Sequence, residues 1–411
     1  MRIVDTLRKE FSFIQGNYLI LVLSWILMDL ANEMPTPNYQ YYVQALGGTG
    51  MALGIIGFAS FIALAAVQFP GGFLADKYGR KWLVSTMTFG LAICFLFFAL
   101  APSWHFILLG VIIQNLCLIY QPALFAMISD ALPPERRGMG FSIIMLINSV
   151  ATTPGPLFAG LLYLQFGLVN SMRIAYLIMT ALYLSAAVLR LRLKETMTSG
   201  DPIQFKEFLS SYPSAIKESF AVWKTVPKSM FWLFISQVLA FLGFALISVI
   251  NALYARDVLL IPESQWWIVF IPLFISMIFL SLPIGKMVDK VGRKIPLLLS
   301  SLAYVPATFL FLHGDFVRVV IAMPLFGLGQ LLAMSAASAL QTDLVPQENR
   351  GKVIGFTNFV SYIFMGLGML LGNYLYASVS SQLPFFIMLV LLIPQFLITL
   401  LLIPEPKKRE K

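Results

Sequence analysis

The sequence predicts an all-helical integral membrane protein, with twelve transmembrane helices in two pseudo-symmetric six-helix bundles. Three observations support this prediction: the composition, a repeat at a fixed offset, and the distribution of Lys and Arg. Of the 411 residues, 59% are hydrophobic and only 11% are charged, whereas charged residues approach a quarter of a soluble globular domain. The chain has too few charges to cover a water-exposed surface.

Two charged motifs recur 213 residues further along the chain. GGFLADKYGRK at 71–81 returns as PIGKMVDKVGRK at 283–294, which aligns Gly72 with Gly285, Asp76 with Asp289 and Arg80 with Arg293. At the same offset, Asp130, Glu135 and Arg137 recur as Asp343, Glu348 and Arg350. Two motifs that share one offset indicate a duplicated chain. Both motifs lie in short loops between apolar runs, so the duplicated unit is a bundle of membrane-spanning helices.

Twelve apolar segments are each close to the roughly 20 residues that a helix needs to span a bilayer. The first half supplies 18–41, 51–74, 82–101, 104–129, 139–164 and 171–189. The second half supplies 230–254, 265–285, 295–312, 317–341, 353–377 and 383–403. The run from Trp82 to Ser129 has no charged residue apart from His105, so it must turn near Pro102.

Lys and Arg gather in alternate loops. Of the 28, all but Arg173, Arg256 and Arg318 fall in the two tails and the loops on one side. The positive-inside rule places that side, with both termini, in the cytoplasm, and we expect a multi-pass protein of the plasma membrane. The net charge of +9 is therefore a topology signal, and no nucleic-acid partner is predicted. Cys94 and Cys117 lie in apolar segments and indicate neither a disulfide nor a metal site.

Three units are predicted: a first bundle at 1–189, a central cytoplasmic loop at 190–228 and a second bundle at 229–411. Within the loop, Asp201-Pro202 reads as a helix start. Apolar residues then recur at helical spacing between lysines up to Trp223. This pattern is typical of an amphipathic helix on the membrane surface. An ordered linker is the preferred interpretation, and a regulatory role is the alternative.

Two six-helix halves, a long central loop and Gly-x-x-x-Asp-x-x-Gly-Arg-Lys after the second helix of each half resemble the major facilitator superfamily, over nearly the whole chain. The resemblance implies the major facilitator fold and a cytoplasmic gate, latched in the outward-open state. In this sequence the gate residues would be Gly72, Asp76, Arg80, Gly285, Asp289, Arg293, Asp130, Glu135 and Arg137. The glycines would let helix ends approach closely, and the aspartates could face helix N-termini. The alternative is a motif that only orders loops and sets topology.

Gly155, Pro156 and Gly160 in the fifth helix are similar to part of the antiporter motif of exporters in this family. Proline and glycine here predict a bend packed tightly against a neighbouring helix. Ala159 stands where that motif has a glycine, and any tight helix crossing could use the same residues. Val111 occupies the place of an arginine that proton-coupled exporters of the family carry in helix 4, so coupling would need another residue.

Asp29 and Glu33 are the strongest candidates for proton coupling. A spacing of four puts both carboxylates on one face of the first helix, near the middle of the bilayer. A charge at that depth costs about 2.5 to 3.5 kcal/mol on insertion scales, so the face should line a cavity. Burial and mutual repulsion both favour the protonated carboxyl. The alternative is that Asn32 and nearby helix ends hold one acid in a structural network.

Polar residues in helices 4, 7 and 10 complete the predicted cavity, because in this family helices 1, 4, 7 and 10 line the central path. The candidates are Asn32, Gln114, Asn115, Gln121, Gln237, Asn251, Gln330 and Gln341. Each could instead bond only to a neighbouring helix. Tyr39, Tyr41 and Tyr42 are interpreted as an interfacial aromatic belt, with an outer vestibule as the alternative.

These features predict a proton-driven exporter of amphipathic small molecules, with cations as one candidate class, that works by alternating access. The alternatives are a proton symporter that imports a small metabolite, a lipid flippase, and a non-transporting sensor on the same fold. We expect protons, a small-molecule substrate and membrane lipids as partners, a monomer, and no cofactor. An enzyme is not expected, since no nucleophile-base pair, metal-ligand cluster or phosphate loop is visible.

Overall fold

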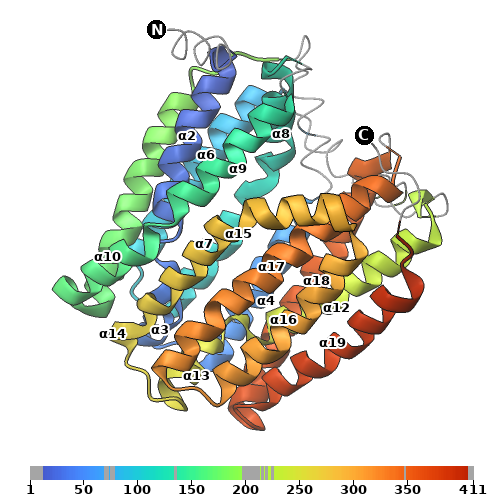
Figure 1. Ribbon diagram of the computed structural model, residues 1–411. Coiled ribbons are helices and arrows are strands. Elements are labelled where there is room, and N and C mark those ends of the chain that lie inside the picture. The colour runs from blue at the N-terminus through green and yellow to red at the C-terminus, as the bar shows by residue number, and fades with distance from the viewer. Residues whose placement is uncertain are drawn as a thin grey trace, which may run out of the picture.

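The computed structural model describes residues 13–68, 74, 79–133, 137–196, 213, 217, 221–223, 226–346 and 349–405, which form helices and short connections (Figure 1). The first half comprises α2 (Gly16–Asn32), η1 (Thr36–Asn38), α3 (Tyr39–Ala45), α4 (Gly50–Val67), α6 (Arg80–Ala99), α7 (Trp104–Cys117), η2 (Leu118–Tyr120), α8 (Gln121–Ala131), α9 (Arg137–Thr152) and α10 (Gly155–Arg190). The second half comprises α12 (Lys228–Ser248), α13 (Asn251–Asp257), α14 (Glu263–Trp266), η4 (Trp267–Val269), α15 (Phe270–Val291), α16 (Lys294–Leu312), α17 (Phe316–Leu344), α18 (Arg350–Ser378) and α19 (Leu383–Leu402).

Twelve spans are present, as predicted. Within the described ranges, 11 apolar helical segments are long enough to cross a membrane, and one of them, Val150–Arg190, has 41 residues. A helix of that length would measure about 60 Å, twice the thickness of a hydrocarbon core. Gly167 divides it, because its φ of 69° and ψ of 177° are not helical. The segment is therefore spans five and six.

Several spans are interrupted part-way. In span one α2 ends at Asn32 and the helix resumes after Pro35, in span five α9 and α10 meet at Pro154, and in span seven α12 ends at Ser248. Proline removes a helical donor and clashes with the preceding turn. Non-helical backbone at membrane depth is stable only where protein or a water-filled cavity surrounds it, so these breaks point to the interior.

The two halves touch at the end of the molecule that holds α3, α13 and α14, here called the closed end (Figure 1). Gly54 and Gly57 of α4 lie directly against Met369 and Asn373 of α18. Two hydrogen bonds also join the halves there: Tyr41 Oη donates to the Ala252 carbonyl at 2.8 Å, and an Arg256 guanidinium nitrogen donates to Gln44 Oε1 at 2.7 Å.

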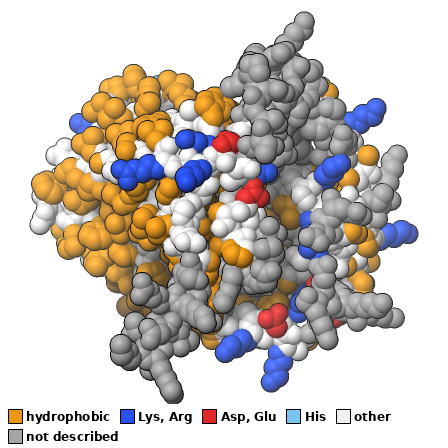
Figure 2. Space-filling model, turned by 90° about the horizontal axis from the view of Figure 1, so that it is seen from above, with side chains coloured by type: hydrophobic (Ala, Val, Ile, Leu, Met, Phe, Trp, Pro, Cys, Tyr) orange, Lys and Arg blue, Asp and Glu red, His pale blue; other side chains and the backbone are white. Residues whose placement is uncertain are grey.

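The other end, here called the motif end, carries the first and last described residues, Phe13 and Glu405, and the two Gly-Arg-Lys repeats. Figure 2 looks onto this end, over which Lys and Arg side chains are spread. Toward it the helices of the two halves diverge (Figure 1). On α15, Phe279 and Leu282 are 74% and 76% exposed, so this length of the helix is not covered by the described part of the first half.

The last described residues of the central loop belong with the second half. The Trp223 ring packs at a tilt against those of Phe234 and Phe356, with centroids 5.0 and 5.4 Å away. The amphipathic helix predicted from Asp201 lies almost entirely outside the described residues, so the boundaries at 189 and 228 stay predictions.

Candidate functional site

Asp29 lies inside the first half. It is only 3% exposed, and Asn148 of α9 donates to its Oδ2 at 3.1 Å. α2 carries the carboxylate inward because Leu21, Val22 and Met28 bury the same helix among the other first-half spans. A buried carboxylate needs such donors or a nearby cation.

Arg190, at the end of α10, is the cation of this cluster. It is 1% exposed; its Nε donates to Ser24 Oγ at 3.0 Å, and another guanidinium nitrogen donates to Thr88 Oγ1 at 2.7 Å. The guanidinium also lies over the Tyr120 ring, 5.5 Å from its centroid. Through Ser24 it is tied to α2, the helix that carries Asp29. Arg190 was not predicted from the sequence, where it counts with the loop cations because it directly follows an apolar run.

The sequence predicts that Asp29 and Glu33 line the central cavity. In this conformation neither is among the residues that line it. Helices of their own half cover this face instead, with Asn148 against Asp29 and the backbone of Gly155 against Glu33. Asn32 does reach the cavity, and its Oδ1 accepts a hydrogen bond from Tyr183 Oη at 2.9 Å. Asn32, three residues after Asp29 on α2, therefore connects the helix of the buried acid with the cavity.

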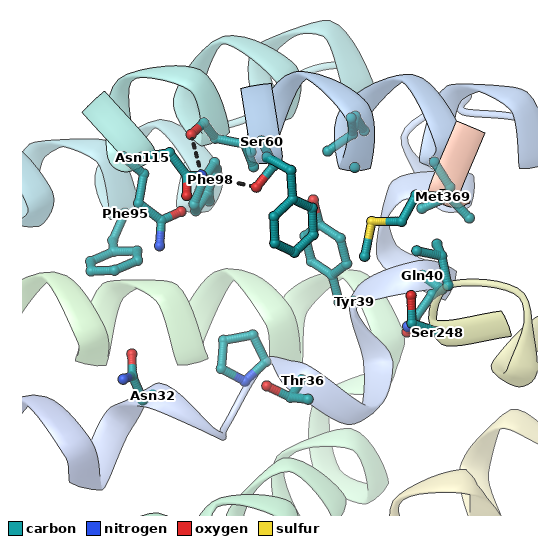
Figure 3. Close-up of a pocket in the computed structure, with 18 of the residues that line it drawn as sticks. Asn32, Thr36, Tyr39, Gln40, Ser60, Phe95, Phe98, Asn115, Ser248 and Met369 are labelled. Carbon is teal, nitrogen blue, oxygen red and sulfur yellow. Dashed lines mark hydrogen bonds between the residues drawn. The ribbon is translucent and has the colours of Figure 1, made fainter. Parts of the chain in front are cut away.

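The central cavity has a volume of about 400 Å³ and takes its walls from both halves (Figure 3). Its polar lining consists of Asn32, Thr36, Gln40, Ser60, Gln114, Asn115 and Ser248. Asn115 Nδ2 donates to Ser60 Oγ at 3.0 Å and so ties α7 to α4. Phe95, Phe98 and Met369 supply apolar walls. This mixture suits an amphipathic ligand.

A smaller cavity of about 240 Å³ adjoins the central cavity and shares Thr36, Gln40 and Ser248 with it. Asn251 and Gln330 line this adjoining cavity. The buried Gln40 Oε1, at the junction, has no hydrogen-bond partner in the described part of the protein, so it is available to a ligand or to water.

Other predicted lining residues lie elsewhere. Gln121 is exposed at the start of α8 and lines neither of these cavities. Gln237 and Gln341 line a third cavity, within the second half.

The tyrosine belt is also a wrong prediction. Tyr41 and Tyr42 are 1% and 0% exposed, and Tyr42 Oη donates to the Phe98 carbonyl at 2.8 Å. Tyr39 lines the central cavity. The break at Pro35 turns α3 into the interface between the halves, where these rings are covered by protein.

At the motif end, Arg80 forms an ion pair with Asp130. Gly79, just before it, has a φ of 94°, and the backbone amides of Arg80 and Lys81 donate to the Glu195 carboxylate at 3.2 and 3.0 Å. Glu195 thus satisfies two of the free amides at the start of α6.

The second half repeats this arrangement. Arg293 Nε donates to Asp343 Oδ2 at 2.9 Å, and the amides of Arg293 and Lys294 donate to Glu405 at 2.8 and 2.9 Å. Gly292 precedes them with a φ of 108°. We call the two sets of contacts the Glu195 and Glu405 clamps. The repeat in the sequence reveals the aspartates but not the glutamates, because Glu405 is 210 residues from Glu195 rather than 213.

Several predicted gate residues lie outside the described part of the chain: Gly72, Asp76, Glu135 and Glu348, together with the side chain of Arg137. The predicted close approach at Gly285 is absent from this conformation, since a Cβ there would meet no described atom within 4 Å. Asp289, expected at a helix N-terminus, is 80% exposed and 3.8 Å from Arg293. Gly285 and Asp289 differ from the predicted gate contacts for the same reason, because the two halves diverge at this end.

Arg350 bonds to backbone carbonyls at the end of α17. Its guanidinium donates to the carbonyls of Val345 and Thr342 at 3.1 and 2.9 Å. It therefore caps the end of α17.

Gly155, Pro156 and Gly160 are buried at the start of α10. A Cβ on Gly155 would lie 2.5 Å from Glu33 Cβ, and one on Gly160 would clash with the Trp267 ring of the second half. These residues permit close contact with α2 on one side and with η4 on the other.

Comparison with known proteins gives consistent matches. A family model described as Major Facilitator Superfamily matches residues 21–262 and 233–411. A "Multidrug resistance protein MdtG" from Enterobacter lignolyticus is 27% identical over 382 residues, covering 88% of this chain and 86% of that protein. One of the same name from Serratia proteamaculans is 30% identical over 249 residues, covering 59% of this chain but only 57% of that protein.

A crystal structure of a mutant of the nucleoside transporter NupG has a similar fold. It superposes with a TM-score of 0.73 at 17% identity, covering 94% of this chain and 99% of that chain. At this identity the likeness concerns the fold alone.

Proposed function

The chain belongs to the major facilitator superfamily of membrane transporters, and from this premise we propose that it exports amphipathic small molecules, including cations, in exchange for protons. The observation that carries the proposal is the buried Asp29 on α2, the helix whose last residue, Asn32, lines a cavity between the halves. The names of the MdtG relatives support export of drug-like compounds.

In this proposal the motif end faces the cytoplasm, following the Lys and Arg distribution. The halves touch at the closed end and diverge at the motif end, so the chain would be inward-facing here. Alternating access requires the contacts of Gly160, Tyr41 and Arg256 to break while the motif end closes.

We assign proton binding to Asp29. As a carboxylate it accepts from Asn148, and Arg190 balances its charge, in the role left open by Val111. Protonation removes the negative charge, which leaves Arg190 uncompensated and weakens the bond from Asn148. A change in this cluster is passed to the cavity through α2, whose last residue is Asn32. Glu33, at the C-cap of α2, directly follows the cavity-lining Asn32, so its charge would act on the cavity from behind its wall and favour cationic over neutral substrates.

The test is flux in proteoliposomes with an imposed pH gradient and tetraphenylphosphonium as the cation. Asp29→Asn should lose pH-driven net flux but keep downhill exchange, because the amide keeps the shape and cannot titrate. Glu33→Gln should reduce tetraphenylphosphonium flux more than flux of a neutral compound. Asp315→Asn is the matched control, since Asp315 caps α17 and an amide can do the same.

Full proton-coupled flux in a double variant of Asp29 and Glu33 would falsify the assignment. Uptake with inward proton flow, in place of export, would favour the symporter alternative.

A further inference from the structure

The third cavity, of about 590 Å³, lies between α12, α16, α17, α18 and α19 of the second half. It adjoins the path described above, because Phe244, Tyr304 and Gln330 line both this cavity and the adjoining one. Its mouth is open: Phe241, Phe244 and Met334 are 39%, 43% and 60% exposed. Its volume falls within the range of about 300 to 1,000 Å³ typical of small-molecule sites.

The floor of this cavity carries polar atoms without partners in the described part of the chain. Thr357 and Gln395 are each 3% exposed, and Thr357 Oγ1 and Gln395 Oε1 make no hydrogen bond there. The buried Gln237 Oε1 and Gln341 Nε2 are unpaired as well. Buried polar atoms are normally hydrogen-bonded, and leaving them unpaired destabilises the fold. Four such atoms belong to side chains that line one cavity, so they are the groups with which an occupant can pair.

The residues lining this cavity define the chemistry of that occupant. Among the described lining residues there is no Asp, Glu, Lys, Arg or His, so nothing offsets the desolvation of an ion. Gln237 and Gln395 offer acceptors, Gln341 offers a donor, and Phe241, Met334 and Leu391 offer apolar contact. The first-half cluster, by contrast, contains an acid and a cation.

We propose that this cavity is a second substrate subsite, selective for uncharged, largely apolar molecules that carry both a hydrogen-bond donor and an acceptor, such as an aromatic amide. The proposal rests on the transport function proposed above, and it assigns different roles to the two halves. The first half binds the proton and selects cations, while the second half binds neutral compounds.

Binding of benzanilide to the full chain in lipid nanodiscs, measured by equilibrium dialysis against protein-free nanodiscs, tests the proposal. Thr357→Val and Gln395→Leu remove unpaired polar atoms without creating new ones, so both variants should fold. Each should weaken benzanilide binding about tenfold and leave tetraphenylphosphonium binding unchanged. N-Methylbenzanilide, which lacks the donor, should bind the original chain more weakly than benzanilide. Ala333→Phe, which fills the cavity, should abolish benzanilide binding.

Thr180→Val is the matched control, because Thr180 is a buried threonine of the first half that donates to the Tyr176 carbonyl, and benzanilide binding should not change. Equal loss of both ligands in Thr357→Val, or benzanilide binding that none of the cavity variants alters, would overturn the proposal. So would an absence of benzanilide binding, which would leave a cavity filled by water. If any of these results is found while tetraphenylphosphonium flux still depends on Asp29, only the subsite proposal fails and the transport proposal is unaffected.

Discussion

Arg190 carries a full charge inside the first half, and three groups hold it there. Ser24 and Thr88 accept hydrogen bonds from two different guanidinium nitrogens, and Tyr120 presents its ring face. Only a planar, forked cation can make all three contacts at once. The residue therefore links α2, α6, η2 and α10 around Asp29.

Arg190→Lys should reduce proton-driven flux at least tenfold although the charge is kept, because an ammonium cannot reach both hydroxyls and the ring. Thermal unfolding of the purified protein should also occur a few degrees lower, as expected when a buried network is broken. Arg192→Lys is the control, since Arg192 is exposed two residues away. Equal flux in Arg190→Lys and Arg192→Lys would show that the guanidinium is not needed.

The two residues of this cluster differ in how far sequence could reveal them. Asp29 stands out because an acid in an apolar run is costly and therefore conspicuous. Arg190 ends such a run, where arginines normally mark topology, so nothing in one sequence separates it from a loop cation. Which way Asp29 faces could not be predicted either, because that depends on Asn148, more than a hundred residues away, and on where α2 ends.

Gly292, between α15 and α16, has a backbone conformation that favours glycine. Its φ of 108° is disfavoured for other residues, and a Cβ would lie 2.5 Å from a Glu405 carboxylate oxygen. Gly79 is in the same position before α6, with a φ of 94° and Glu195 Oε2 at 2.9 Å. The repeated Gly-Arg-Lys motif therefore needs its glycine because a side chain at that position would strain the backbone and collide with the glutamate of the clamp.

Gly292→Ala should destabilise the second half by about 1 to 2 kcal/mol, from the backbone alone, and more if Glu405 is displaced. Thermal unfolding monitored by tryptophan fluorescence measures the effect. Gly351→Ala provides the control, because a Cβ at Gly351 meets no described atom within 4 Å and its φ is not positive. An unchanged midpoint for Gly292→Ala would mean that the clamp adds nothing to stability.

At the scale of elements, the spans were predictable and their interruptions only partly so. Length and apolarity mark each span, and prolines mark the breaks at Pro35 and Pro154. The break after Ser248 has no proline and no glycine; it depends on tertiary contacts of α13 with the other half. The aromatic belt was predicted wrongly for the tyrosines of α3 because their surroundings also depend on tertiary contacts. An aromatic residue near the end of a span can lie at a lipid interface or between helices.

Across the whole molecule, Arg256 makes several contacts that hold the halves together at the closed end. It donates to Gln44 of the first half, pairs with Asp257 and Glu263 at 2.7 and 3.0 Å, and lies over the Tyr41 ring. Because the contacts with Gln44 and Tyr41 form only when this end is shut, they bias the conformational equilibrium.

Arg256→Gln should shift the population toward the state that is open at the closed end. A cysteine at Ser248, in a chain with Cys94 and Cys117 replaced by alanine, should then react several-fold faster with an impermeant thiol reagent applied from that side. Arg318→Gln serves for comparison, because Arg318 bonds the nearby His313 carbonyl and not the other half. Identical labelling rates in the two variants would exclude Arg256 from the gate.

The clamps also bear on how the chain is made. Glu195 closes the first clamp from just after α10, so the first half can complete the contacts within itself before any helix of the second half leaves the ribosome. Force measurements on stalled nascent chains should therefore show a pulling event as Glu195 emerges, and Glu195→Gln should weaken it. The second half would finish in the same manner at Glu405, near the end of the chain, so the duplicated gene would encode two successive folding events.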